Sequence, residues 1–229
     1  MFFIEETKLK DVGKVKFDNY ILFEKPRKKK TSGGGVAIGC IEELNPVWVK
    51  EAEDDVEALS IEIFVKKMKI RCCVAYGFQE NEEIDKKEAF WSYLDNEVIE
   101  AKESGAGLII QFDGNLWAGN RIIPNDPRMQ NKNGKLFELF LKRNSHLTVV
   151  NSLELCQGLI TRRRYRNNKS EESVLDFFLV CNLVLPHITQ MVIDEEKRHV
   201  LTNYEQVKMG GKAADSDHNT LFMDVNLDM

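Results

Sequence analysis

The order of the expected elements predicts an α/β fold, in which two mixed β-sheets pack face to face with helices outside. Short apolar runs typical of strands recur along the 229 residues, and two amphipathic helical stretches lie between them. The sequence shows no internal repeat and no interdomain linker, so a single domain is expected. Apolar residues make up 43% of the sequence and charged residues 30%, which is typical of a globular protein with a sizeable core.

The first part of the chain is predicted to form strands joined by turns. Apolar side chains alternate with others over residues 56–65, a pattern typical of a strand with one buried face. Residues 66–69 form a short turn, after which residues 70–76 return as the antiparallel partner. Glycines occupy positions 33–35. Because neither a GKS/GKT motif nor a helix follows them, a tight turn into a strand is favoured over a phosphate cradle. Further strands are expected at residues 2–4, 20–23 and 36–40.

Two helices are predicted in the middle of the chain. Over residues 85–104 the apolar side chains, Phe90 and Val98 among them, fall on one stripe, and Gly105 is a suitable stop. A second helix over residues 135–143 carries cationic residues in its last turn, where they interact favourably with the helix dipole. The remaining strands are expected at residues 108–112, 147–151, 173–181, 188–193 and 220–225.

The net charge of −5 argues weakly against nucleic acid as a partner, but the charge is unevenly distributed. Basic clusters occupy residues 25–30, 66–71 and 162–166, whereas acidic residues concentrate at 51–55 and 80–87. That segregation permits a basic face on an acidic protein. Each basic run taken alone is more often a solvated loop than a binding site.

The five cysteines show no spacing typical of zinc ligands and lie mostly in apolar runs, so buried thiols in a reducing compartment are expected. No apolar run is long enough to span a membrane. The apolar residues 1–4 are followed at once by Glu5 and Glu6, unlike a signal peptide. These features predict an intracellular protein without a membrane partner.

Two short polar clusters adjoin apolar runs that are far apart in the sequence. Asp113 and Asn115, separated by a glycine, directly follow one run, and Asp217 and His218 directly precede another. If each cluster lies at a strand end, a rigid sheet can hold carboxylate, amide and imidazole at one rim. These are the groups that metal-assisted attack on a phosphate ester needs. An Asx turn that caps the strand accounts equally well for residues 113–115 taken alone.

Two further residues belong to the same expected rim. Asp176 lies within an apolar strand, where a buried carboxylate needs a partner, although it could also cap a backbone loop. Tyr76 ends its strand, where its hydroxyl could contact a phosphate or serve a purely structural purpose.

Several short motifs then occur in a characteristic order. They are Glu6-Thr7, Gly33-Gly34-Gly35-Val36-Ala37, Tyr76, Asp113-x-Asn115, Thr161-Arg162, Ser173-x-x-Asp176 and Ser216-Asp217-His218. On these residues the sequence resembles the endonuclease/exonuclease/phosphatase superfamily, and within it the apurinic-type endonuclease domains of non-LTR retrotransposons. The resemblance spans nearly the whole chain. It implies a four-layer α/β sandwich, a divalent cation (Mg²⁺ or Mn²⁺), no small-molecule cofactor, and hydrolysis of a phosphodiester in DNA.

The resemblance also implies roles for single residues around the cation. Glu6 would be its direct carboxylate ligand, and Asp217 would assist the metal site. Asp113 would orient or deprotonate the attacking water, while Asn115 would hold a phosphate oxygen. His218 would donate to a developing negative oxygen, since an imidazolium does this well.

Other residues would support these groups or bind the substrate. Asp176 would pair with the histidine and keep it protonated, and the Tyr76 hydroxyl would contact the phosphate. Thr161 and Ser173 would lie around the phosphate and the aspartate network. Residues 162–166, which include Arg162 and Arg164, would form a loop that grips the DNA backbone. Tyr165 of that loop is available for stacking on a base.

The sequence departs from the family pattern at two places. Phe112 stands where the family has a glycine before the catalytic Asp-x-Asn. The family's first strand, which carries an asparagine, has no counterpart before Glu6, so we expect residues 1–229 to form one such domain lacking that strand. We therefore predict a nuclear, DNA-nicking endonuclease of the retrotransposon type. The alternatives are a phosphatase or RNA nuclease on the same scaffold, or a catalytically impaired nucleic-acid-binding remnant.

Overall fold

A six-stranded mixed sheet forms one layer of the molecule. The computed structural model describes residues 1–7, 18–27, 34–53, 55–166, 169–198 and 216–227, so that Gly33 and Lys28–Lys30 lie outside the described residues. Neighbouring strands of the sheet are antiparallel except for one parallel pair, β6 and β7, which needs a crossover. Helix α1 supplies that crossover. The order is β4 (Val47–Glu51), β5 (Glu57–Val65), β6 (Met68–Tyr76), β7 (Gly107–Asp113), β12 (Asp176–Cys181), β8 (Leu147–Val149).

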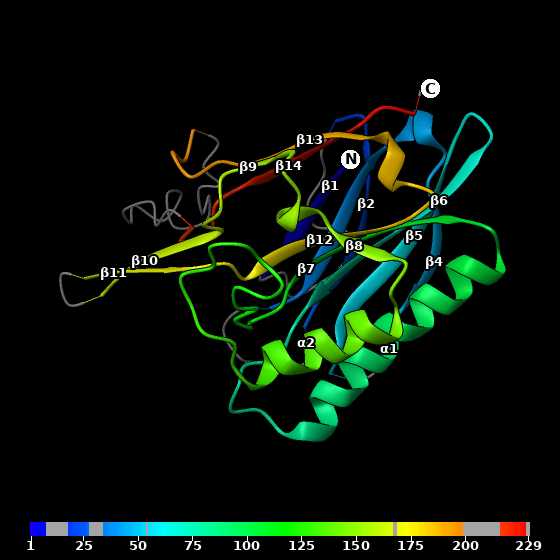
Figure 1. The fold of residues 1–229 in the computed structure, drawn as a ribbon. Coiled ribbons are helices and arrows are strands. Elements are labelled where there is room, and N and C mark those ends of the chain that lie inside the picture. The colour runs from blue at the N-terminus through cyan, green and yellow to red at the C-terminus, as the bar shows by residue number, and fades with distance from the viewer. Residues whose placement is uncertain (8–17, 28–33, 54, 167–168, 199–215, 228–229) are drawn as a thin grey trace, which may run out of the picture.

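The opposing layer consists of two three-stranded sheets (Figure 1). The first is antiparallel, in the order β1 (Phe2–Glu5), β3 (Val36–Ile41), β2 (Tyr20–Lys25). The second is mixed, in the order β14 (Leu221–Val225), β13 (Ile188–Ile193), β9 (Cys156–Gln157). In the described part of the chain, β1 and β14 each lie at the end of their sheet. Two mixed-sheet layers facing each other confirm the predicted fold class, although the second layer is divided.

Both α-helices cover the outer face of the six-stranded sheet (Figure 1). Side chains on β12 alternate between its two faces. Phe177 packs on the helix side, 5.2 Å from the Phe137 ring of α2, and Phe178 packs on the sheet side, 5.9 Å from the Phe3 ring of β1. Phe112 is fully buried in the same aromatic cluster, 6.1 Å from the Trp91 ring of α1. The phenylalanine that replaces the family's glycine is thus a core residue. The helix bounds are α1 (Ile84–Glu103) and α2 (Lys132–Arg143).

Most predicted elements are present with small shifts of their ends. Helix α2 begins earlier than predicted because Asn131 caps it, accepting a hydrogen bond of 2.8 Å from the Gly134 amide. Gly34 and Gly35 lead directly into β3, and no helix follows them; Gly33, the first glycine of the predicted turn, lies outside the described residues. Strands β4 and β9 were not predicted. Short 3₁₀ helices occupy η1 (Glu42–Leu44), η2 (Val150–Ser152) and η3 (Leu185–His187).

The basic segment predicted to be a loop is instead a strand. Residues Arg162–Arg166 form β10 and pair with β11 (Lys169–Ser173) in a hairpin that extends from the body of the molecule (Figure 1). Arg163 lies opposite Glu172 in the ladder, with Nε 2.9 Å from the carboxylate, and such cross-strand ion pairs favour a hairpin. The strand predicted over residues 173–181 is therefore two strands, because β11 ends at Ser173 and β12 begins at Asp176.

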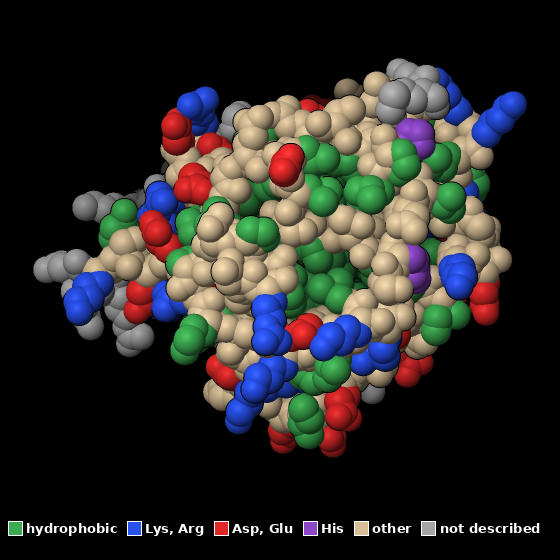
Figure 2. All heavy atoms as spheres, in the orientation of Figure 1, with side chains coloured by type: hydrophobic (Ala, Val, Ile, Leu, Met, Phe, Trp, Pro, Cys, Tyr) green, Lys and Arg blue, Asp and Glu red, His purple; other side chains and the backbone are tan. Residues whose placement is uncertain are grey.

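Basic side chains are concentrated on parts of the surface, and the cysteines lie mostly in the core. Figure 2 shows lysine and arginine side chains gathered over α2 and its neighbouring loop, with others on the side where the hairpin projects. All five cysteines are unbonded, and four of them are buried. Among the described residues, no helix combines the length and apolar character needed to cross a membrane.

Candidate active site

Three neighbouring strands bring Tyr76, Asp113 and Asp176 into one row. Tyr76 is the last residue of β6 and lies opposite Asp113, the last residue of β7. Asp113 lies in turn opposite Asp176, the first residue of β12. Neighbouring strands are about 4.8 Å apart, so the register alone places these side chains within reach of one another. Both aspartates are buried.

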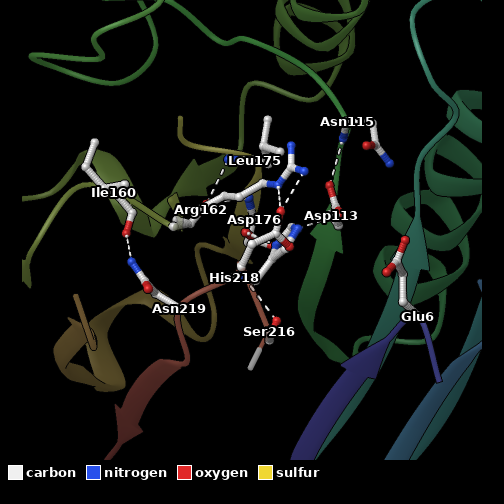
Figure 3. Close-up of polar contacts among 12 residues, drawn as sticks. Glu6, Asp113, Asn115, Ile160, Arg162, Leu175, Asp176, Ser216, His218 and Asn219 are labelled. Carbon is white, nitrogen blue, oxygen red and sulfur yellow. Dashed lines mark hydrogen bonds and ion pairs between the residues drawn. The ribbon is translucent and has the colours of Figure 1, made fainter. Parts of the chain in front are cut away.

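Glu6 joins this row from the other layer of the sandwich. It directly follows β1, and the Tyr76 hydroxyl donates a hydrogen bond of 2.6 Å to its Oε1. Its backbone adopts a left-handed conformation, with φ of 53°. Figure 3 shows Glu6 and Asp113 at the ends of strands from the two layers, with His218 beyond Asp113. The structure links Glu6 to Asp113 and His218 through Tyr76, which lies opposite Asp113 in the sheet.

His218 connects the two aspartates. Its Nδ1 lies 3.0 and 3.1 Å from the carboxylate oxygens of Asp176, and its Nε2 lies 3.9 Å from Oδ2 of Asp113. The His218 amide donates to Ser216 Oγ at 3.1 Å, and the Asn219 amide donates to the Thr161 carbonyl at 2.6 Å. The segment before β14 is therefore fixed on both sides of the imidazole.

The charges in this cluster are strongly coupled. Burial alone would lower the pKa of His218, but the carboxylates of Asp176, Asp113 and Asp217 outweigh it and raise the pKa to about 10. Burial and the charge of Asp176 raise the pKa of Asp113 to about 7, with His218 opposing them. At neutral pH the histidine is thus an imidazolium beside a carboxyl group that is poised to exchange a proton.

Glu5 is a further carboxyl group at the site that sequence reasoning missed. Burial and the charges of Asp176 and Asp113 raise its pKa well above the usual value. Its Oε1 is buried and has no hydrogen-bond partner among the residues that the structure describes. The consecutive acids Glu5 and Glu6 at the end of an apolar run were the available signal.

Asn115 is held by the loop that follows β6. Its backbone is left-handed, with φ of 44°, and its amide donates to Asp113 Oδ1 at 2.9 Å. Its side-chain amide donates to the Gly77 carbonyl at 2.8 Å, and Gln79 donates to its Oδ1 at 2.6 Å. A side chain at Gly77 would collide with the Gly114 carbonyl, 2.7 Å from the added Cβ. Gln79 was not predicted as a site residue.

Asp217 and Arg162 pair with each other. Nε and Nη2 of the arginine lie 2.8 and 2.7 Å from Oδ2 of Asp217. Burial tends to raise the pKa of Asp217, but the guanidinium lowers it below its usual value. The carboxylate predicted to assist a metal and the arginine predicted to hold DNA are both engaged in this ion pair.

Thr161 supports the start of β12. It is fully buried, and its hydroxyl accepts hydrogen bonds from the amides of Leu175 at 2.8 Å and Asp176 at 3.1 Å. Ser173 is buried too, and its carbonyl accepts a hydrogen bond from the Thr161 amide. This agrees with the prediction that Thr161 belongs to the aspartate network. Both residues secure the strand that carries Asp176.

Two residues lie outside the central cluster. Asn151 supports β12 from its other edge, donating to the Asp176 carbonyl at 3.1 Å and accepting from the Phe178 amide at 3.0 Å. No signal in the sequence distinguishes it. Arg164 is exposed on the projecting hairpin, next to Tyr165, whose side chain is 76% exposed.

The residue types fit a hard divalent cation. Asp113, Asp176 and His218 each offer a ligand atom, and these atoms lie within 4.8 Å of one another. His218 Nδ1 is already bonded to Asp176, so the carboxylates are the suitable donors. Glu6, which accepts the Tyr76 hydrogen bond, is not part of this group of three. The buried Oε1 of Glu5 is an orphaned polar atom beside these carboxylates.

Comparison with known proteins places this geometry in a recognised fold. The sequence matches no protein-family model, and comparison with curated proteins finds no similar sequence. The structure is similar to the endonuclease domain of TRAS1, a telomere-specific non-LTR retrotransposon, at a TM-score of 0.63 and 17% identity over 93% of this chain and 83% of that domain. It is also similar to the 3′-5′ exonuclease NExo from Neisseria meningitidis, at a TM-score of 0.67 and 16% identity. That match covers 98% of this chain and 88% of the exonuclease.

A third similar structure is a mannosyl-6-phosphatase from Bacteroides thetaiotaomicron, with a TM-score of 0.54 and 10% identity over 91% of this chain and 77% of that enzyme. Another is described as an endonuclease/exonuclease/phosphatase family protein of the same organism. At identities this low, the structural similarity establishes the fold only. The activity has to be inferred from the residues of the site. The chain has the fold of the endonuclease/exonuclease/phosphatase proteins.

Proposed function

We propose that this chain is a metal-dependent phosphodiesterase that nicks DNA, of the retrotransposon endonuclease type. The observation that carries the proposal is the linked row of Glu6, Tyr76, Asp113, His218 and Asp176, drawn from both layers of the sandwich. A base, an imidazolium and carboxylates at one rim match the needs of phosphodiester hydrolysis.

Asp113 is the group suited to accept the proton of the attacking water. A general base works best when its pKa lies near the working pH, and burial raises the pKa of Asp113 to about 7. Asn115 is held by Gly77 and Gln79 beside this carboxylate, where its amide can orient a phosphate oxygen. Tyr76 keeps its proton, since burial raises its pKa, so its hydroxyl is a donor to Glu6 and to substrate.

His218 is the group suited to stabilise developing negative charge. Because Asp176 helps to keep it protonated, it can donate from Nε2 towards a phosphate oxygen while Nδ1 stays bonded to the carboxylate. Thr161 fixes the backbone at Asp176, so the direction of that donor is set by the sheet.

Glu6 is the residue that would hold Mg²⁺ or Mn²⁺. Such a cation neutralises phosphate oxygens and stabilises the charge of the leaving alkoxide. We assign Asp217 a more distant part, in which it orients Arg162 towards the phosphate backbone.

The hairpin favours a long polyanion as substrate. Arg164 and the exposed Tyr165 could contact a backbone phosphate and a base along a nucleic acid. NExo has been solved bound to product DNA hairpin, and TRAS1 is a retrotransposon. A related phosphatase remains the second candidate, because the mannosyl-6-phosphatase shares the fold.

Residues 1–229 would act as one endonuclease/exonuclease/phosphatase-like domain. Among the described residues, β1 and β14 are end strands of two separate sheets, and no described strand joins those sheets. A retrotransposon-type enzyme of this kind would act in the nucleus. A catalytically impaired remnant is the competing proposal, and activity measurements separate the two.

The test is nicking of supercoiled plasmid in the presence of Mg²⁺. We expect Asp113→Asn and His218→Gln each to lower the nicking rate by at least about a hundredfold, since each removes a group that acts on the transition state. Matched controls are Asp95→Asn, whose parent residue pairs with Arg143 at 2.7 Å away from the site, and His187→Gln, whose parent imidazole Nδ1 lies 3.0 Å from the Asn226 carbonyl. Both controls should nick like the parent.

Parallel assays with poly(A) RNA and mannose 6-phosphate distinguish the alternatives. Preference for either over plasmid would replace the proposed substrate, and an inactive parent chain that still binds DNA would favour the remnant. Full activity of both site variants would show that the assigned roles are wrong.

A further inference from the structure

We propose that Glu57 and Arg27 are positioning residues for the candidate metal ligand Glu6, acting through Tyr76. The inference deepens the proposed function and rests on it, since it assumes that Glu6 binds the cation. Neither Glu57 nor Arg27 was predicted as a site residue from the sequence, although Arg27 belongs to the basic cluster at residues 25–30. Both lie in the part of the chain that the structure describes.

Glu57 anchors two segments with its two carboxylate oxygens. It is the first residue of β5, 7% exposed, and lies opposite Tyr76 in the sheet. Its Oε2 accepts a hydrogen bond of 2.6 Å from the Gly35 amide, and its Oε1 accepts one from Arg27 Nε. The loop before β3 and the end of β2 are thus fixed to the same buried carboxylate.

Arg27 occupies a place that is shaped for it. Its guanidinium carbon lies 5.7 Å from the centroid of the Tyr76 ring, within cation–π range. On its other side lies Gly34, where an added Cβ would fall 2.1 Å from Arg27 Nε. Gly34 has φ of 87°, a conformation that side chains rarely adopt. The glycine therefore allows the guanidinium to pack against the tyrosine.

Tyr76 transmits this arrangement to Glu6. Its ring is held on one face by Arg27, and its hydroxyl donates to Glu6 Oε1 at 2.6 Å. Gly35 strengthens the link from the backbone side, because its carbonyl accepts the Thr7 amide at 3.1 Å. Glu6 is exposed and sits at a strained backbone position, so its carboxylate depends on these contacts for a fixed place. Outer partners of this kind commonly change metal affinity by tenfold or more.

The test is Mn²⁺ binding to the full chain without substrate, followed by the loss of the free-ion electron paramagnetic resonance signal. We expect Glu57→Gln and Arg27→Ala each to weaken Mn²⁺ binding by about tenfold. The glutamine can still accept the Gly35 hydrogen bond, so the loop keeps its anchor. The double variant should bind no more than about threefold more weakly than either single one, since both changes break the same link.

Charge and position make opposite predictions for Arg27→Ala. Removing a cation near Glu6 should tighten Mn²⁺ binding if charge alone mattered. Weaker binding in both variants, which alter the local charge in opposite directions, therefore supports positioning. Tighter or unchanged binding by Arg27→Ala overturns the proposal. If thermal melting shows that Glu57→Gln does not fold, Arg27→Ala decides alone.

A matched control lies on the same strand. Glu62 of β5 pairs with Arg71 at 3.0 Å, five residues, or roughly 17 Å, from Glu57 along the strand. Glu62→Gln loses a comparable ion pair and should leave Mn²⁺ affinity unchanged. Glu6→Gln reports on the metal site itself. If it binds Mn²⁺ like the parent, the proposed metal ligand is wrong, whereas loss of binding there with no effect of Arg27→Ala refutes positioning only.

Discussion

Replacing Asp176 with asparagine tests the electrostatic basis of the site. Asp176 is the carboxylate that contributes most to raising the pKa of His218 to about 10 against the effect of burial. Asparagine keeps the size of the side chain and a possible hydrogen bond at 3.0 Å from Nδ1, but it removes the charge. Asp113 and Asp217 still oppose burial in the variant, so we expect the pKa of His218 to fall to about its ordinary value of 6.5.

The size of the effect follows from the protonated fraction of His218. With a pKa of about 10, nearly all of the parent is imidazolium at pH 8. With a pKa of about 6.5, only about 3% of the Asp176→Asn variant is protonated there, so the nicking rate should fall about thirtyfold relative to the parent. At pH 6 the same comparison predicts a loss of less than about twofold. The charge of Asp176 also raises the pKa of Asp113, so the substitution lowers that pKa too and the rate ratio reflects both groups.

Single-turnover nicking from pH 5.5 to 9.5 measures this ratio, and the imidazole proton resonances of the four histidines report the pKa directly. His218→Gln identifies the resonance of interest, and Asp95→Asn controls for the loss of an acid elsewhere. A parent His218 that loses its proton near pH 6.5 would refute the reasoning, as would a rate ratio that does not change with pH. Because the folded pKa is raised, the stability contributed by His218 is complete below about pH 6.5 and is lost as the pH rises through about 10.

Two further variants test the periphery of the site. Arg164→Ala should weaken DNA binding and reduce the slope of log affinity against log salt by about one, with no change in the nicking rate at saturating DNA; an unaltered slope would argue against a phosphate contact. Thr161→Val leaves the Leu175 and Asp176 amides without their acceptor and should lower the free energy of unfolding by about 1–3 kcal/mol in a denaturant titration, whereas Thr161→Ser should retain most of it. Equal stability of the two variants would contradict this support role.

The sequence predicted the fold well because its apolar patterns are long and regular. The alternation over 56–65 and the helical stripe around Val98 both correspond to elements of the structure. The prediction of a loop at residues 162–166 was wrong because this segment is held in a hairpin, where Arg163 pairs with Glu172 on the opposite strand. A cross-strand ion pair of this kind is a contact between segments, which a local charge run does not reveal.

The sequence predicted which residues belong to the site better than it predicted which of them contact one another. Strand ends marked Tyr76, Asp113 and Asp176, since polar groups at the end of apolar runs stand out. The pairing of Asp217 with Arg162, and the burial of Glu5, depend on how separate strands approach one another. Spacing along the chain carries no information about such approaches. For the same reason the contact of Glu57 with Arg27 could not be predicted from the sequence.

Two interpretations of residues 113–115 were considered, a catalytic pair of polar side chains and an Asx turn, and the structure is compatible with both. The Asx turn exists, because the Asn115 amide donates to Asp113 Oδ1, and it holds Asn115 at φ of 44°. Glu6 shows the same feature after β1, with φ of 53°. Left-handed backbone at a residue other than glycine costs about 1–2 kcal/mol, so each conformation needs outside support. That support comes from Tyr76 for Glu6 and from Gly77 for Asn115. Two strained residues facing one row of carboxylates are what a site selected for its geometry, rather than for stability, would contain.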